Sequence, residues 1–139
     1  MDVTPLVAEG QQIIQSYADG RFRVAGALYH GPVIVFPHTT IRWDTRRSVS
    51  ELIAEDFDAL FAAVEPRGSV ESGDDAGQGG VDIVLLGTGA KMEFLPPVLR
   101  AALKAKGLPV ESMDTGAACR TYNVLMAEGR RVAVALLPV

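Results

Sequence analysis

The residues with the clearest chemical potential lie in one stretch, from Met113 to Leu125, where a short strand pattern turns into a helix pattern. Asp114 and Thr115 stand at the start of that helix. Their side-chain oxygens can accept hydrogen bonds from the free backbone N–H groups of a first helical turn. Arg120 follows in the early turns, where the partial positive charge of the helix N-terminus makes a cation unfavourable without a negative partner. This stretch is the predicted site.

Two groups can supply the negative charge beside Arg120. One is the Asp114 carboxylate, in an internal ion pair that ties the helix to the preceding loop, and the other is a bound anion. We favour the ion pair. Arg120 and Asn123 are three residues apart, so they are predicted to be neighbours on one face of the helix. The rest of the circumference, with Ala118 and Tyr122, is apolar, as in a helix packed on two sides.

A second turn precedes this stretch. Gly87-Thr88-Gly89 follows a buried strand pattern, but Met92 stands where a dinucleotide fingerprint needs a third glycine, and no Walker lysine follows. In parallel α/β sheets, ligands bind beyond the carboxyl ends of the strands. Both turns are predicted there, so we expect a cleft between Gly87–Gly89 and Asp114–Gly116.

The remaining reactive side chains carry little chemistry. Cys119, between small residues, is predicted to be a buried hydrophobe, and His30 and His38 are remote from acid or thiol clusters. Trp43 is predicted to lie at the edge of the core with its N–H satisfied. We infer no metal, no cofactor and no catalytic residues. The candidate ligand or partner site comprises Trp43, Gly87, Thr88, Gly89, Asp114, Thr115, Arg120, Tyr122 and Asn123.

Composition narrows the class of protein. The chain has 139 residues, of which 48% are hydrophobic and 22% charged, which is typical of one soluble globular domain. With 13 basic and 17 acidic residues, its net charge of -4 argues against nucleic acid as a partner. The single cysteine excludes an intrachain disulfide and suits a reducing compartment. No apolar run is long enough for a membrane span, so we expect a cytoplasmic protein.

The first half of the chain combines strands with one helix. Asp19-Gly20 between two alternating runs predicts a β-hairpin, and the apolar run 33–36 predicts a strand buried on both faces. Ser48 and Glu51 have capping-box spacing, which predicts a helix from Ser48 whose start can slip to about Ala54. Its apolar stripe is Ile53, Phe57, Leu60, Phe61 and Val64. Residues 68–80 are glycine-rich and predict a flexible loop.

The second half alternates strands and helices. Strands are predicted at 81–86, 108–113 and 131–137, with helices between them that begin at Pro96-Pro97 and at Asp114 and end near Gly107 and Gly129. Val98, Leu99, Ala102 and Leu103 form the predicted apolar side of the first of these helices. The fold class is therefore α/β, with a mixed central sheet in a three-layer arrangement, helices on both faces and an N-terminal β-hairpin region. Residues 1–139 form one domain.

Several of these motifs together resemble a known family. They are Gly87-Thr88-Gly89, Leu95-Pro96 with Leu99-Arg100, Gly107 to Glu111, Met113-Asp114-Thr115, Tyr122 to Leu125 and Glu128 to Arg131. As a set, they resemble the small single-domain family that includes the mitochondrial complex I assembly factor 3 and the adipogenesis-associated domain protein. The resemblance covers nearly the whole chain. It implies a three-layer α/β fold and, in the mitochondrial member, a role in building a respiratory complex.

Two classes of function follow. The first is a noncatalytic binding or assembly protein, in which the surface around Trp43, Arg120 and Asn123 docks a protein partner, such as a respiratory complex subunit, or a small anion. The second is an enzyme that uses Arg120 as an anion clamp and Asp114, Thr115 or Tyr122 in proton transfer. We favour the first, because no set of base, nucleophile and metal ligands is evident.

Overall fold

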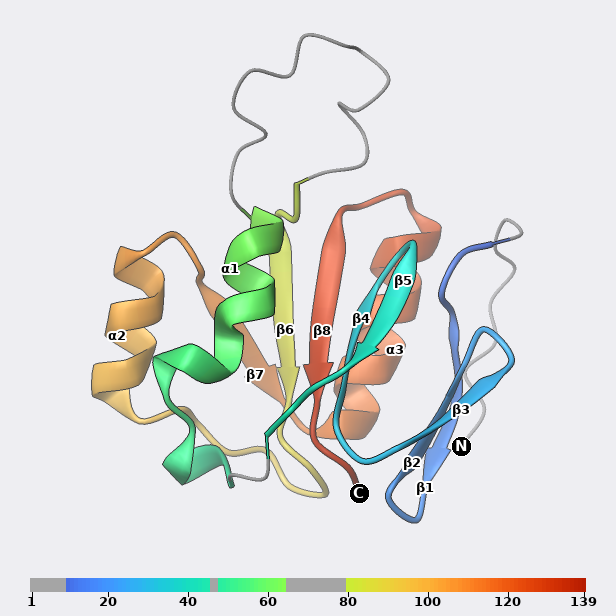
Figure 1. Ribbon diagram of the computed structural model, residues 1–139, viewed down its shortest axis with the longest axis horizontal. Helices are drawn as coiled ribbons and strands as arrows, with labels where there is room; N and C mark the ends of the chain where they lie inside the picture. The colour runs from blue at the N-terminus through green and yellow to red at the C-terminus, as the bar shows by residue number, and fades with distance from the viewer. Residues whose placement is uncertain (1–9, 46–47, 65–79) are drawn as a thin grey trace, which may run out of the picture.

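The computed structural model of the protein describes residues 10–45, 48–64 and 80–139. The predicted flexible loop over 68–80 lies, apart from Gly80, outside the described residues. Its centre is a five-stranded sheet in the order β5-β4-β8-β6-β7 (Figure 1). β6 is parallel to β7 and β8, whereas β4 is antiparallel to β5 and β8, so the sheet is mixed as predicted. The strands are β4 (Val33–Phe36), β5 (Thr39–Arg42), β6 (Ile83–Gly87), β7 (Val110–Met113) and β8 (Val132–Leu136).

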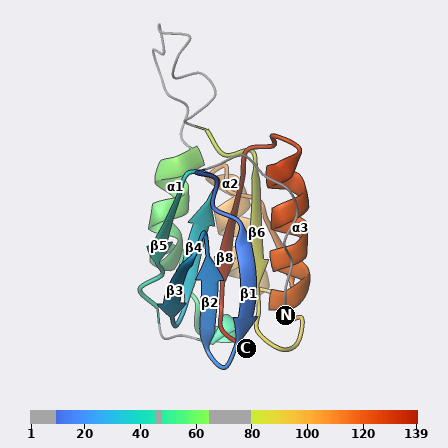
Figure 2. The same ribbon diagram turned by 90° about the vertical axis from the view of Figure 1, so that its right-hand side faces the viewer.

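The strand order explains why helices cover both faces. The chain steps outward from β6 to β7 through α2 (Pro97–Ala105) and then back across β6 to β8 through α3 (Thr115–Ala127). Right-handed connections in opposite directions place their helices on opposite faces of the sheet. Figure 2 shows α1 and α3 on the two sides of the sheet. The predicted three-layer α/β architecture is confirmed.

A three-stranded antiparallel sheet packs beside α3. It consists of β1 (Ile14–Ala18), β2 (Arg21–Val24) and β3 (Ala27–His30), in that order. The predicted hairpin turn is confirmed: Asp19 and Gly20 have φ of 54° and 76°, which suits a two-residue turn with both central residues left-handed. Phe22 and Val24 of β2 are buried in the same hydrophobic core as residues of α3 and β8. The small sheet therefore closes the core over the α3 side.

The predicted helix does not run from Ser48; its helical segment starts at the later predicted position, Ala54. Ser48 and Glu51 do form a capping box, but it starts only the single 3₁₀ turn η1 (Val49–Glu51). The backbone is then extended at Ile53, whose N–H donates to the Asp56 carboxylate at 2.9 Å and begins a second 3₁₀ turn, η2 (Ala54–Phe57). The α-helix α1 covers only Asp58–Val64. Two successive caps thus divide one apolar pattern, and they leave the Ile53 side chain 40% exposed.

Within the described residues, the sheet separates two hydrophobic cores. Along β4, Val33 and Val35 pack on the α3 side, whereas Ile34 and Phe36 pack on the side of α1 and α2. All four are buried, which confirms the strand buried on both faces. Leu99 and Leu103 of α2 join the second core as predicted, but Val98 is 83% exposed and does not belong to the apolar side.

α3 approaches the central sheet closely at Gly87, at the end of β6. A Cβ there would lie 2.8 Å from Leu136 Cδ2, 2.9 Å from Thr115 Oγ1 and 3.1 Å from Thr115 Cα. Because Thr115 Cα belongs to the backbone of α3, relief requires the helix to move. We expect Gly87→Ala to lower the free energy of unfolding by about 1–3 kcal/mol, measured by urea denaturation.

The matched control is Gly80→Ala, where the nearest atom to a new Cβ is the Arg131 side chain at 3.7 Å. This variant should denature close to the wild-type midpoint. Equal stability of Gly87→Ala and the wild type would show that α3 does not depend on this close approach.

Candidate functional site

The start of α3 is held by two neighbouring side chains with different roles. Asp114 is the N-cap, and its carboxylate accepts a hydrogen bond from the Ala117 N–H at 2.9 Å. The Thr115 side chain is fully buried. Its hydroxyl donates to the Leu137 carbonyl at 2.7 Å and accepts from the Gly89 N–H at 2.8 Å. Thr115 therefore connects the ends of β6 and β8 to α3.

The turn after β6 is bonded just as directly to the end of β7. The Thr88 N–H donates to the Met113 carbonyl and the Thr115 N–H donates to the Gly89 carbonyl, both at 2.9 Å. The Thr88 hydroxyl donates to the Lys91 carbonyl at 2.6 Å and accepts from the Glu93 N–H at 3.1 Å. The structure thus brings both predicted turns together at the carboxyl ends of the strands (Figure 1). Hydrogen bonds join the two turns directly, so the prediction of a cleft between them is wrong at these contacts.

The predicted ion pair between Asp114 and Arg120 is wrong. Among the described residues, the ion pairs are Asp19–Arg21, Glu128–Arg130 and Asp82–Arg131, and the Asp114 carboxylate serves the helix cap instead. Arg120 is exposed beside the first turn of α3. A Cβ on Gly116 would collide with the Tyr17 hydroxyl and would lie 3.4 Å from Arg120 Nη1. Tyr17 of β1 therefore lies over this turn, next to Arg120.

Arg120 and Asn123 do not share an exposed face, because Asn123 is only 2% exposed. Its amide binds the Ile14 backbone twice: Oδ1 accepts from the Ile14 N–H at 3.0 Å, and Nδ2 donates to the Ile14 carbonyl at 2.8 Å. The Asn123 side chain thus takes the place of a neighbouring strand at the start of β1. An asparagine among apolar helix residues was the sequence signal for such a buried polar contact.

Tyr122 is buried beside Asn123. Its hydroxyl donates to the Gln12 carbonyl at 2.8 Å, so it also ties the N-terminal segment to α3. Burial raises the pKa of Tyr122, so this phenol stays protonated at neutral pH. A group with this role is unsuited to proton transfer with a substrate.

Trp43 lies in the other core, on the side of α1 and α2. It is 5% exposed, its Nε1 donates to the Asp56 carbonyl at 2.6 Å, and its ring packs against Phe57 with centroids 5.8 Å apart. The predicted satisfied N–H is therefore confirmed. The structure does not bring Trp43 together with Arg120 and Asn123 on one surface.

Exposed apolar side chains occur in the connection from β6 to α2, which leaves the sheet at the same end as the candidate site (Figure 1). Met92 is 41% exposed and Phe94 is 71% exposed, followed by Val98 in the first turn of α2. Sequence reasoning missed them, because a hydrophobic residue next to a helix start is expected to pack inward.

Metal sites and membrane-spanning helices were searched for in the described part of the chain. Within it, no group of three His, Cys, Asp or Glu side chains is placed to hold a metal ion. No helix in the same residues is long and apolar enough to cross a bilayer.

Replacement of Asn123 tests the contact with Ile14. Asn123→Ala leaves a buried N–H and a buried carbonyl without partners, so we expect a loss of about 1–3 kcal/mol in the free energy of unfolding, measured by urea denaturation.

Asn123→Asp should make the stability of the protein depend on pH. Burial beside the Ile14 carbonyl raises the folded pKa of the new carboxyl above its unfolded value of about 3.9. The variant should therefore be most stable at acidic pH and lose stability as pH rises through that folded pKa, measured by urea denaturation across pH. If the free energy of unfolding of Asn123→Asp varied with pH only as much as that of the wild type, residue 123 would be in contact with water.

Cys119 provides a second test of the packing of α3. It is fully buried as predicted, and burial raises the pKa of its thiol from 9.0 to about 12. Only the thiolate is a strong nucleophile, so iodoacetamide at pH 8 should label native protein far more slowly than urea-unfolded protein, followed by mass spectrometry. Equal rates for the two states would show an accessible, reactive thiol.

Comparison with known proteins adds the family. Residues 14–137 match the family described as "Protein of unknown function (DUF498/DUF598)". An uncharacterised protein of Rhodobacter capsulatus is 38% identical over 125 residues, covering 90% of this chain and 83% of that protein. The protein named NADH dehydrogenase [ubiquinone] 1 alpha subcomplex assembly factor 3 is 35% identical in mouse and 34% identical in human, again over 90% of this chain. The match spans 60% of the length of each of these two mammalian proteins.

Solved structures agree with the fold. A crystal structure from Bordetella parapertussis has a TM-score of 0.73 at 32% identity and covers 95% of this chain and 99% of its own. A Bordetella pertussis protein described as a Mth938-like domain has a TM-score of 0.70 at 31% identity, with 99% and 92% covered. The sequence match, these neighbours and the shared architecture confirm the resemblance seen in the motifs: the chain belongs to the DUF498/DUF598 family and is similar in sequence to complex I assembly factor 3.

Proposed function

We propose that the protein is a noncatalytic binding protein of the assembly-factor type, and that its partner is a subunit of a respiratory complex. The observation that carries this proposal is the similarity, over 90% of the chain, to proteins named as complex I assembly factors. The proposal concerns the part of those proteins that this chain matches. We place the protein in the cytoplasm, because its single cysteine is a buried thiol and needs no oxidising compartment.

Most polar side chains of the candidate site form hydrogen bonds within the protein, and this supports a binding role. The hydroxyls of Thr88, Thr115 and Tyr122 all donate to backbone carbonyls. The Asp114 carboxylate caps α3, and the Cys119 thiol is held neutral by burial. General acid–base and nucleophilic catalysis need a group within reach of a substrate and with a pKa near the working pH. These residues are occupied in holding the fold together.

Two exposed features beside the candidate site offer contacts to a partner. Arg120 presents a guanidinium without an ion pair among the described residues, and such a group suits a partner carboxylate. Phe94 presents an apolar side chain in the connection after β6. An exposed large apolar residue next to a polar rim is a common feature of protein interaction surfaces.

Affinity capture from a lysate of the native cells tests this function. The tagged wild type should enrich subunits of a respiratory complex over an unrelated bait, quantified by mass spectrometry. Arg120→Ala and Phe94→Ser should each lose most of that enrichment with little change in melting temperature, because both side chains are exposed. Arg120→Lys keeps the charge but not the planar fork and should retain part of it.

The control is Arg130→Ala, which removes an exposed arginine whose ion pair with Glu128 is 3.8 Å long. It should enrich the same subunits as the wild type. The proposal fails if no respiratory subunit is enriched, and a selective thermal shift with a metabolite would then favour a small-molecule function.

A further inference from the structure

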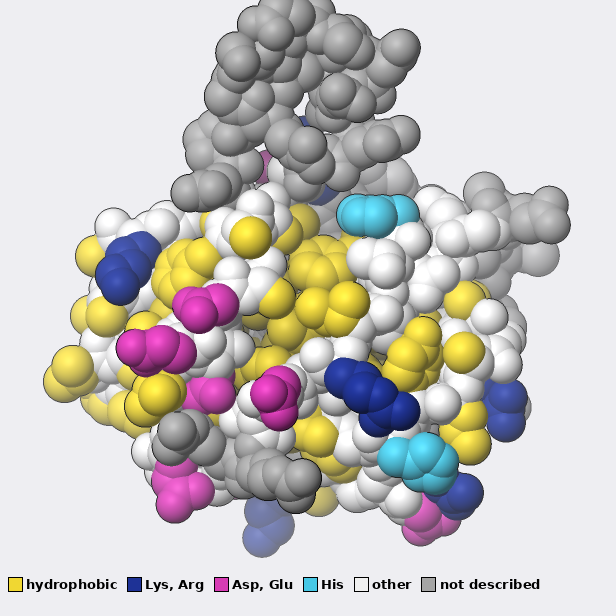
Figure 3. Space-filling model, viewed as in Figure 1, with side chains coloured by type: hydrophobic (Ala, Val, Ile, Leu, Met, Phe, Trp, Pro, Cys, Tyr) yellow, Lys and Arg dark blue, Asp and Glu magenta, His cyan; other side chains and the backbone are white. Residues whose placement is uncertain are grey.

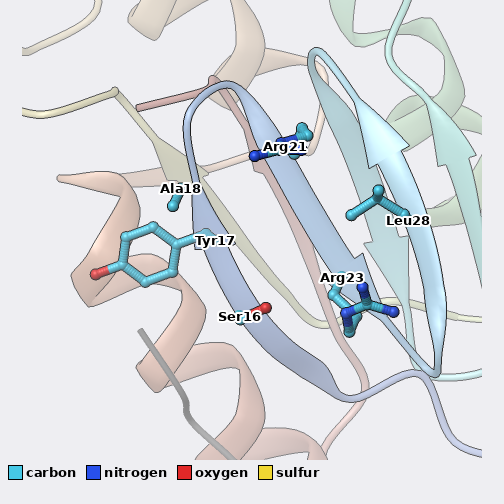
Figure 4. A pocket seen from close by; sticks show the side chains of 6 residues that line it. All are labelled: Ser16, Tyr17, Ala18, Arg21, Arg23 and Leu28. Atoms are coloured by element: carbon cyan, nitrogen blue, oxygen red, sulfur yellow. The ribbon is translucent and has the colours of Figure 1, made fainter.

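The outer side of the three-stranded sheet is an exposed face with a regular arrangement of side chains. Residues directly paired across antiparallel strands point to the same side. Ser16, Arg23 and Leu28 therefore form one row across β1, β2 and β3, and Ala18, Arg21 and His30 form the next. Figure 4 shows Arg21 and Arg23 on β2 with Leu28 on the adjacent strand, while Tyr17 extends toward α3. A surface pocket is lined by Ser16, Tyr17, Ala18, Arg21, Arg23 and Leu28.

Positive charge is concentrated here in an otherwise acidic protein. Residues 10–42 contain three arginines and one aspartate, which gives +2 with neutral histidines, whereas the whole chain has a net charge of -4. Arg42 of β5 brings the third guanidinium to the edge of this face, because its Nη1 donates to the His30 carbonyl at 3.1 Å. Figure 3 shows Lys/Arg and His side chains gathered over β2, β3 and β5, at the lower right of the view. We name Arg21, Arg23, Leu28, His30 and Arg42 the basic face.

The arginines of the basic face keep donors for a ligand. Arg21 contacts Asp19 through one nitrogen at 3.6 Å, and the two side chains are 46% and 82% exposed. Arg23 makes one long contact, from Nη1 to the Gly26 carbonyl at 3.5 Å. A guanidinium has five N–H donors arranged to bind carboxylates in pairs. Leu28, 44% exposed beside Arg23, adds an apolar contact.

We propose that the basic face binds an extended acidic segment of a partner protein. Side chains on one face of a strand repeat every two residues, about 6.8 Å apart, so Arg21 and Arg23 have the spacing of two carboxylates at alternate positions of an extended segment. An apolar side chain of the segment then lies on Leu28. This contact deepens the proposed function and rests on it in one respect: the partner is a protein.

The charge distribution favours a protein segment over nucleic acid or a membrane. Long polyanions and anionic bilayers interact with the field of the whole molecule, and that field is set by a net charge of -4. A short segment interacts with the local face only, because charges farther than about 10 Å are largely screened at 0.1 M salt. The basic face is small and local, as this mode of binding requires.

A synthetic peptide tests the contact directly. The probe is a rhodamine-labelled peptide with glutamate at alternate positions and leucine and threonine between them, titrated with the full chain by fluorescence anisotropy. A peptide with glutamine in place of glutamate should not bind. Arg23→Glu and Arg21→Glu should each weaken binding at least about tenfold, and raising the salt from about 0.05 to about 0.3 M should weaken wild-type binding.

The matched control is Arg100→Glu, which reverses an exposed arginine on α2. It should bind the peptide like the wild type. Arg23→Gln provides a milder variant in case the charge reversal unfolds the protein, and a melting curve of each variant checks the fold. The proposal is overturned if the glutamate peptide does not bind, or if Arg100→Glu weakens binding as much as Arg23→Glu. It is equally overturned if oligo(dT) or phosphatidylglycerol vesicles bind more tightly than the peptide in an Arg23-dependent way.

The outcomes of the peptide test and of the lysate capture are independent, so the failure of one proposal can be told from the failure of the other. Arg120→Ala should bind the peptide normally, because Arg120 lies on α3 and outside the basic face. If the wild type binds the peptide but enriches no respiratory subunit from the lysate, only the respiratory partner is refuted. Capture of those subunits by both the wild type and Arg23→Glu would leave the proposed function in place and refute the role of the basic face.

Discussion

The close approach of α3 to the ends of β6 and β8 is the contact on which the rest of the structure depends. At Gly87 there is no room for a Cβ between the strand, Leu136 and the Thr115 backbone. The Thr115 hydroxyl then satisfies the Gly89 N–H and the Leu137 carbonyl at the same point. The buried Thr115 hydroxyl both donates and accepts a hydrogen bond, and Gly87 lets the helix backbone approach the strand closely. Together these contacts fix the position and direction of α3 on the sheet.

From this fixed end, α3 organises the N-terminal half of the chain. Asn123 binds the backbone of Ile14 as a strand neighbour would, and Tyr122 binds Gln12. These contacts hold β1 against α3, and the hairpin then covers the helix side of the sheet with Phe22 and Val24. Asn123 and Tyr122, two residues of the predicted site, therefore join α3 to the N-terminal segment, as expected for buried polar groups that must be paired.

Function is consequently expected at the surface rather than inside a pocket of reactive groups. Arg120 lies on α3, Phe94 lies in the connection from β6 to α2, and the basic face lies on the small sheet. In the proposed binding function, exposed charged and apolar side chains on separate elements provide the contacts to a partner. The similarity to assembly factors is consistent with that arrangement.

Local patterns were sufficient to predict much of the fold. Asp19-Gly20 predicted the hairpin, Pro96-Pro97 and Gly107 bounded α2, and Asp114 capped α3, because each of these signals acts within a few residues along the chain. Alternating elements and right-handed connections predicted a mixed sheet with helices on both faces, but the strand order came from the structure. At the candidate site, the sequence predicted that both turns lie at the carboxyl ends of the strands and that Cys119 is buried.

The tertiary structure decided which polar and apolar groups face each other. The Asp114 carboxylate accepts from the Ala117 N–H and does not pair with Arg120. The Ile53 and Val98 side chains are exposed, although both continue apolar stripes in the sequence. Asn123 binds Ile14, which is 109 residues away in the chain. Periodicity assigns a residue to a face of its own helix, but the partner of that face is set by packing between distant segments. Capping and turn residues therefore predict many element ends from the sequence, whereas the pairing of buried polar groups exists only after the chain has folded.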